Sequence, residues 1–91
     1  MFMLVSYDIR DIKRLPKVAK LMEGYGDRVQ YSVFECLLTE RQLQELQRRL
    51  KRLIDPDSDS VRFYRLCESC KEGITILGQG TVSSSELFFI A

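Results

Sequence analysis

The order of the predicted elements indicates an α+β (α/β) fold, a ferredoxin-like sandwich with two helices on one face of a mostly antiparallel sheet. Three observations lead to this fold class. A dense apolar run opens the chain, two segments carry apolar residues at helical spacing, and β-rich runs follow each of these segments. We expect residues 1–91 to form one domain, whose thin core makes association with a second copy favourable.

The first run, residues 2–8, predicts a central strand that is buried on both faces. Because side chains alternate along a strand, Leu4 and Asp8 share one face and Tyr7 lies on the other. Asp8 is at the carboxyl end of this strand, where its carboxylate can reach solvent. On position alone, an aspartate here is more often a cap for the following helix than a metal ligand.

Residues 9–25 predict the first helix. We expect Asp11 to be its N-cap or first-turn acid, Pro16 to lie near its start, and Gly24 and Gly26 to end it. The cations of this segment form a basic surface just beyond the first strand: Arg10, Lys13, Arg14, Lys17 and Lys20. Such a surface is consistent either with a solvated helix face or with phosphate contact.

Residues 28–38 are rich in β-branched and aromatic side chains, and predict either one kinked strand or two strands folded sharply near Ser32. With both helices on one face of the sheet, the other face remains for a partner. We expect Leu4 and Phe34 to be apolar residues of that face, which is a first indication of a dimer.

The clearest helix begins after Thr39, which forms a capping box with Gln42. Its apolar stripe consists of Leu43, Leu46, Leu50 and Leu53. Glu45 can pair with Arg49 one turn later. We interpret the cations of this helix as a solvated face, with nucleic-acid contact as the lesser alternative: Arg48, Arg49, Lys51 and Arg52.

The last third of the chain predicts a loop at residues 55–60 and a strand at 61–66. The alternating acids of the loop lack the glycine and the final glutamate of a calcium loop. Cys67 and Cys70 favour a hairpin loop over a zinc or redox site, because only one other cysteine is available as a ligand. The apolar run 87–91 requires burial, and a terminal strand pairing across a dimer would provide it.

Composition excludes several classes of function. The absence of histidine excludes Ser-His-Asp triads and the usual histidine zinc sites. The net charge is +1, yet residues 1–54 carry 11 basic and 7 acidic side chains, which fits a basic face. Three cysteines favour reduced thiols, and the first apolar run is too short for a signal peptide or a membrane span. We therefore expect a cytoplasmic protein with no membrane partner.

Several blocks of residues, spread over nearly the whole chain, match one known family. They are Tyr7-Asp8-Ile9, residues 24–36 (GYGDRVQYSVFEC), residues 62–67 (RFYRLC) and residues 76–78 (ILG). On these blocks the chain resembles the small CRISPR-associated adaptation protein, the ferredoxin-like dimeric endonuclease that partners the CRISPR integrase. The resemblance implies a homodimer with a metal at the subunit boundary, nuclease activity in some members, and a role in spacer acquisition.

The resemblance also assigns a site. Asp8 matches the family's metal-site aspartate, which implies a catalytic role, and Tyr7, Ser32 and Phe34 match positions around it. Because Mg²⁺ (or another divalent cation such as Mn²⁺) is usually held by one or two carboxylates, a two-fold axis that pairs both copies of Asp8 would complete a pocket. Ser32 itself is not expected to be a nucleophile, since no base is available to activate it.

The expected nucleic-acid contacts are basic residues near that site: Arg10, Arg14, Lys17 and Arg28. Leu15 stands where many family members carry arginine, and Arg14 is the candidate to compensate. Two hypotheses follow: a magnesium-dependent phosphodiesterase dimer acting on RNA or DNA, and a non-catalytic DNA-binding scaffold dimer that bridges integrase subunits. A ferredoxin-like small-ligand or RNA-binding module unrelated to CRISPR is a weaker third.

Overall fold

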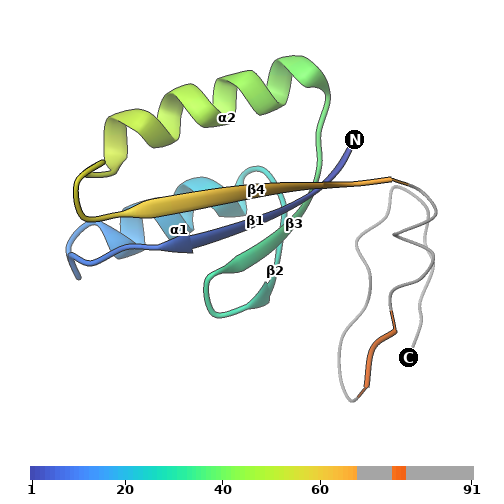
Figure 1. Ribbon diagram of the computed structural model, residues 1–91, viewed down its shortest axis with the longest axis horizontal. Helices are drawn as coiled ribbons and strands as arrows, with labels where there is room; N and C mark the ends of the chain where they lie inside the picture. The colour runs from blue at the N-terminus through green and yellow to red at the C-terminus, as the bar shows by residue number, and fades with distance from the viewer. Residues whose placement is uncertain (68–74, 78–91) are drawn as a thin grey trace.

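The computed structural model describes residues 1–67 and 75–77. Its elements are β1 (Phe2–Asp8), α1 (Leu15–Glu23), β2 (Asp27–Gln30), β3 (Val33–Leu37), α2 (Glu40–Leu53) and β4 (Ser60–Leu66) (Figure 1). The strands form a sheet in the order β2-β3-β1-β4, and each neighbouring pair is antiparallel. This arrangement confirms the predicted ferredoxin-like sandwich.

The strand β1 is central because β3 and β4 pair along its two sides. Leu4 lies opposite Glu35 on one side and Tyr64 on the other. The last residue of the strand, Asp8, lies opposite Ser60 at the start of β4. The prediction that residues 2–8 form the central strand is therefore confirmed.

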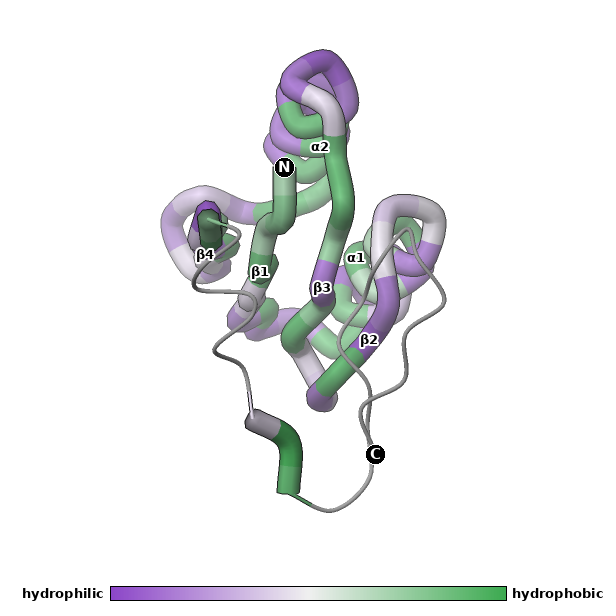
Figure 2. The backbone as a smooth tube through the Cα atoms, turned by 90° about the vertical axis from the view of Figure 1, so that its right-hand side faces the viewer, coloured by the Kyte–Doolittle hydropathy of each residue, from purple (hydrophilic) through white to green (hydrophobic). Residues whose placement is uncertain are grey.

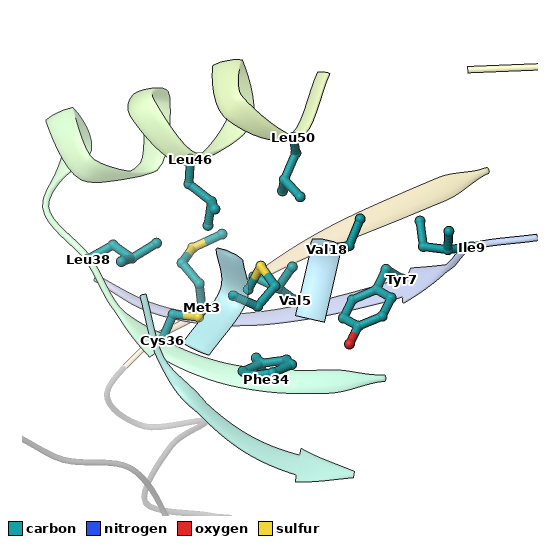
Figure 3. Close-up of a cluster of buried hydrophobic side chains, with 11 residues drawn as sticks. Met3, Val5, Tyr7, Ile9, Val18, Phe34, Cys36, Leu38, Leu46 and Leu50 are labelled. Atoms are coloured by element: carbon teal, nitrogen blue, oxygen red, sulfur yellow. The ribbon is translucent and has the colours of Figure 1, made fainter. Parts of the chain in front are cut away.

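Both helices lie on the same side of the sheet (Figure 2). The buried cluster between the two layers joins Met3, Val5 and Tyr7 of β1 to Val18 and Met22 of α1 and to Leu46 and Leu50 of α2 (Figure 3). Leu4 and Asp8 alternate with these core residues along β1, so they point to the face of the sheet that the helices leave uncovered.

The expectation that Phe34 belongs to the uncovered face is wrong. Phe34 is fully buried, at 0% exposure, within the core on the helix side. The cause is the strand register, since Phe34 lies directly opposite Val5 and cross-strand neighbours share a face. Leu4, which is half-buried on the other face, behaves as expected.

Residues 28–38 form two strands rather than one, which selects the second of the two predicted alternatives. The chain turns at residues 31–32 between β2 and β3. Gly26 permits the close approach of β2, because a Cβ atom there would collide with the backbone of Glu35 and with the Sγ atom of Cys36. A glycine before β2 is thus required by packing.

The start of α1 differs from the expectation. Asp11 is not its N-cap, since the cap position is Arg14 and Pro16 lies in the first turn. Asp11 instead closes a turn before the helix: its backbone carbonyl accepts from the N–H groups of Arg14 and Leu15, both at 3.0 Å, and its side chain accepts from Lys13 N at 2.7 Å. An aspartate that bonds to nearby backbone in this way favours a turn over a helix.

The start of α2 agrees with the sequence. The Thr39 hydroxyl accepts from the backbone N–H of Gln42 at 3.2 Å, and the Gln42 side chain accepts from the backbone N–H of Thr39 at 2.8 Å. The predicted Cys67–Cys70 hairpin and the terminal strand lie outside the described residues, apart from Cys67 itself. Within residues 1–67 and 75–77, no helix is long and apolar enough to cross a membrane.

Candidate functional site

Asp8 presents its carboxylate to solvent at the end of the central strand. Its side chain is 67% exposed and lies on the face of the sheet opposite the helices. The Nη2 atom of Arg10 is 3.9 Å from the Oδ2 atom of Asp8, and the Arg10 side chain is 71% exposed. An ion pair this long and this exposed contributes little to stability, so both groups remain available to a ligand.

A buried carboxylate, Asp59, fixes the loop that follows Asp8. It accepts hydrogen bonds from the backbone N–H of Arg10 at 2.9 Å and from the backbone N–H of Asp55 at 2.9 Å. The Arg14 guanidinium donates to both of its oxygens, from Nε at 2.9 Å and from Nη2 at 3.2 Å. Asp59 therefore links the loop between β1 and α1 to the loop between α2 and β4.

These contacts determine the charge of Asp59. The hydrogen bond from the Arg14 guanidinium holds the pKa of this carboxyl group well below its ordinary value, and the two backbone N–H donors lower the pKa further. Sequence reasoning missed Asp59, since nothing in the alternating acids of residues 55–60 marks which one is buried. Its partners Arg14 and Arg10 are 45 and 49 residues away in the chain.

Arg14 is committed to this linkage. All three of its guanidinium nitrogens donate hydrogen bonds, to Asp59, to Asp11 and to Ser58. The Arg14 side chain is 26% exposed, and Arg14 is also the N-cap residue of α1. Of the four basic residues expected to contact nucleic acid, Arg14 thus has the fewest donors left for phosphate.

Tyr7, Phe34 and Arg28 form a second group on the helix side of the sheet. The rings of Tyr7 and Phe34 stack with centroids 6.2 Å apart, and the guanidinium carbon of Arg28 lies 5.3 Å from the Phe34 centroid. Burial raises the pKa of the Tyr7 hydroxyl, and the nearby Arg28 guanidinium opposes that shift. A hollow of about 430 Å³ beside this group is lined in part by Tyr7, Arg28 and Tyr31.

The predicted residues therefore occupy different parts of the molecule. Asp8 and Arg10 lie at the end of β1, while Tyr7, Phe34 and Arg28 are separated from the Asp8 carboxylate by the sheet. Ser32 connects the two parts through its backbone, since its carbonyl accepts from the Tyr7 N–H at 3.1 Å. Lys17 lines a third region, an open groove between α1 and α2.

A metal ion would find one anionic ligand from this chain at Asp8. The described residues contain no group of three or more Cys, Asp or Glu side chains that could hold a metal ion. The exposed carboxylate nevertheless has the oxygen donors that Mg²⁺ prefers, and Mg²⁺ commonly binds through one or two carboxylates, waters and substrate phosphates. Asp8 provides one carboxylate ligand of this kind.

Comparison with known proteins gives consistent matches. A family model described as CRISPR associated protein Cas2 matches residues 1–74. A Chloroflexus aurantiacus protein named CRISPR-associated endoribonuclease Cas2 1 is 53% identical over 81 residues, which cover 88% of this chain and 87% of the relative. A Thermus thermophilus protein named CRISPR-associated endonuclease Cas2 2 is 46% identical over 76 residues, which cover 84% of this chain and 80% of the relative.

Solved structures agree with these matches. The crystal structure of Streptococcus pyogenes Cas2 at pH 6.5 is 42% identical, has a TM-score of 0.77, and is matched over 86% of this chain and 100% of that chain. The hypothetical protein TT1823 from Thermus thermophilus is 44% identical, with a TM-score of 0.78, over 87% of this chain and 92% of its own. The family model spans each described element from β1 to β4, so the chain belongs to the CRISPR-associated Cas2 family.

Proposed function

We propose that this protein is a nuclease of CRISPR adaptation, a homodimer that hydrolyses phosphodiester bonds in RNA or DNA with Mg²⁺ or Mn²⁺ held by Asp8 of both subunits. The observation that carries the proposal is the 67% exposed carboxylate of Asp8 at the end of the central strand. The names of the relatives agree with it, since they are called an endoribonuclease and an endonuclease.

The uncovered face of the sheet supports self-association. Its apolar residues include Tyr64, which is 43% exposed, and Leu4, Val33 and Leu66, which are half-buried. An apolar sheet face of this kind favours an interface with a second copy. Because a two-fold interface brings the same patch of both subunits together, two Asp8 side chains on this face would approach each other.

The chemistry follows from the charges. Two facing carboxylates repel each other, and a divalent cation between them relieves that repulsion. When bound there, such an ion supplies an activated water and stabilises negative charge on a phosphodiester. Arg10, beside Asp8, is available to contact the phosphate group. Asp59 holds the backbone N–H of Arg10 at 2.9 Å and so keeps this loop in position.

A second candidate is a non-catalytic DNA-binding scaffold that bridges CRISPR integrase subunits during spacer acquisition in the cytoplasm. The specific observation in its favour is that the described residues include no group of three or more Cys, Asp or Glu side chains that could hold a metal ion. On this alternative, Asp8 has no catalytic role, and the basic side chains of the loops and helices carry the function.

Cleavage of labelled RNA and DNA separates the two candidates. Wild type, Asp8→Asn and Asp57→Asn are compared with and without Mg²⁺, Asp57 being an exposed acid that controls for the loss of one charge. We expect Asp8→Asn to lower cleavage to the level measured with EDTA and Asp57→Asn to retain it. Cleavage by Asp8→Asn at the wild-type rate would refute the nuclease proposal.

Mixed dimers test whether the pocket is shared. Excess Asp8→Asn protein is added to a fixed amount of wild type under conditions of subunit exchange. If each site needs both carboxylates, activity per wild-type subunit falls as mixed dimers form. If each subunit acts alone, that activity stays constant, and the shared pocket is excluded.

A further inference from the structure

An open groove of about 930 Å³ lies between α1 and α2, on the side of the molecule away from the Asp8 face. Its floor is largely apolar and includes Leu21, Leu37, Leu38 and Leu53. Its basic lining residues are Lys17, Lys20, Arg49 and Arg52. The groove thus has two walls of positive charge over an apolar base.

The cations are arranged in two rows. Lys17 and Lys20 lie three residues apart on α1, and Arg49 and Arg52 lie three residues apart on α2. Residues three apart are neighbours on one face of a helix, so each helix contributes one row. Arg48 and Lys51 have the same spacing on α2 but do not line the groove. The cations of α2, for which the sequence predicts one solvated face, therefore fall into two groups: Arg49 and Arg52 line the groove, and Arg48 and Lys51 do not.

Most of this charge is unpaired. Lys17, Lys20 and Arg52 are exposed, and among the described residues none forms an ion pair or a side-chain hydrogen bond with them. Arg49 is held against Tyr25: its guanidinium carbon lies 5.7 Å from the ring centroid, and its Nη1 atom donates to the Tyr25 hydroxyl at 3.1 Å.

Glu45 is the one acidic residue that lines the groove. It accepts a hydrogen bond from the Tyr25 hydroxyl, the same group that accepts from Arg49. Through Tyr25, the Glu45 carboxylate helps to hold the Arg49 guanidinium in the groove, and it adds one negative charge to the lining. Four cations against one carboxylate leave the lining strongly positive, which suits a polyanion.

We propose that this groove binds one strand of nucleic acid through its phosphates. Basic walls that follow a backbone, together with apolar and aromatic surface for sugars and bases, are the general features of sites for single strands. Contacts to phosphates carry no sequence information, so binding through them is expected to be independent of sequence.

The groove site is separate from the proposed cleavage site. The sheet lies between the helix layer, which lines the groove, and the face that carries the Asp8 carboxylate (Figure 2). A dimer formed through that face would leave the helices outside the interface. The groove would hold a strand away from the reacting bond, and it does not depend on catalysis at Asp8.

The test is fluorescence anisotropy with labelled single-stranded DNA and RNA oligonucleotides, using the full chain in EDTA over a range of salt concentrations. The groove variant combines Lys20→Gln with Arg52→Gln. The control combines Arg48→Gln with Lys51→Gln, which removes the same charge from exposed positions outside the groove. Thermal unfolding confirms that all three proteins are equally folded.

We expect the groove variant to bind single strands at least ~5-fold more weakly at 0.1 M salt, and the slope of log K against log salt to fall by about 1.4. The control should change less than about 2-fold, because its cations contact no phosphate. Equal losses in the two variants, or no loss in the groove variant, would overturn the proposal. A duplex probe that responds as strongly as the single strand would also overturn it.

The two proposals fail independently. Asp8→Asn is measured in the same binding assay, where wild-type affinity is expected. If Asp8→Asn still cleaves, the nuclease proposal fails while the groove is untouched. If the groove variant still binds, the groove proposal fails whatever the outcome of the cleavage assay.

Discussion

The Phe34 side chain contributes both to the core of the fold and to the group of residues around Tyr7 and Arg28. It is 0% exposed, stacks on Tyr7 with centroids 6.2 Å apart, and carries the guanidinium of Arg28 at 5.3 Å. Phe34→Ala should lower the free energy of unfolding by about 3–5 kcal/mol, through lost burial and the cavity it leaves. Phe34→Leu keeps most of the volume and should cost about 1–2.5 kcal/mol, from the loss of the two ring contacts.

Urea unfolding at one fixed protein concentration measures both variants, since the stability of a dimer depends on concentration. For Phe34→Ala the midpoint should fall by at least ~1 M, given a slope of about 1–3 kcal/mol per molar urea. Tyr31→Ala is the control on the neighbouring turn, because Tyr31 is 79% exposed and its removal should change stability by less than about 0.5 kcal/mol. If Phe34→Ala costs no more than Tyr31→Ala, the assigned register of β3 is wrong.

Two further predictions concern the helix cap and the buried carboxylate. Thr39→Ala removes the 3.2 Å capping bond to Gln42 and should cost about 1 kcal/mol in urea unfolding, whereas Thr39→Ser should retain most of the stability. Because the pKa of Asp59 is lowered in the folded protein, its stabilising effect is complete above the ordinary carboxyl value of 3.8 and is lost as the pH falls below it. The difference in the free energy of unfolding between wild type and Asp59→Asn should therefore be largest near neutral pH and should decrease below pH 3.8. A difference that stays constant from pH 7 to about 2.5 would contradict the lowered pKa of Asp59.

The elements that follow from local pattern could be predicted from the sequence. Thr39 and Gln42 are three residues apart, so their capping box depends on no distant contact. The apolar run of residues 2–8 similarly predicts a central strand. The face on which Phe34 lies could not be predicted, because it depends on how β3 pairs with β1, and a shift of one residue reverses every side chain.

The candidate site was predictable only in part for the same reason. The resemblance to the family identifies Asp8, but the position of Arg14 depends on Asp59, a partner 45 residues away. In the sequence, nothing distinguishes Arg14 from the other basic residues of this segment, so its hydrogen bonds to the buried Asp59 could not be predicted. Lys17 likewise matches a basic position of the family, yet it lines the groove between α1 and α2.

The Asp8 carboxylate and the cations of the groove lie on opposite sides of the sheet, which would allow one small chain both to cleave and to bind nucleic acid. A carboxylate that collects a divalent cation is best kept apart from unpaired lysines and arginines, since these would neutralise it and repel the cation. Within residues 1–67 and 75–77, the Asp8 carboxylate forms one weak ion pair, to Arg10 at 3.9 Å, whereas four cations line the groove on the helix side. Nucleic acid attracted to the groove would thus raise the local concentration of phosphate near the molecule without occupying the cation site. On this reasoning, neutralising Lys20 and Arg52 should weaken substrate capture and leave the rate of the bound complex unchanged, which is the opposite of the expected effect of Asp8→Asn.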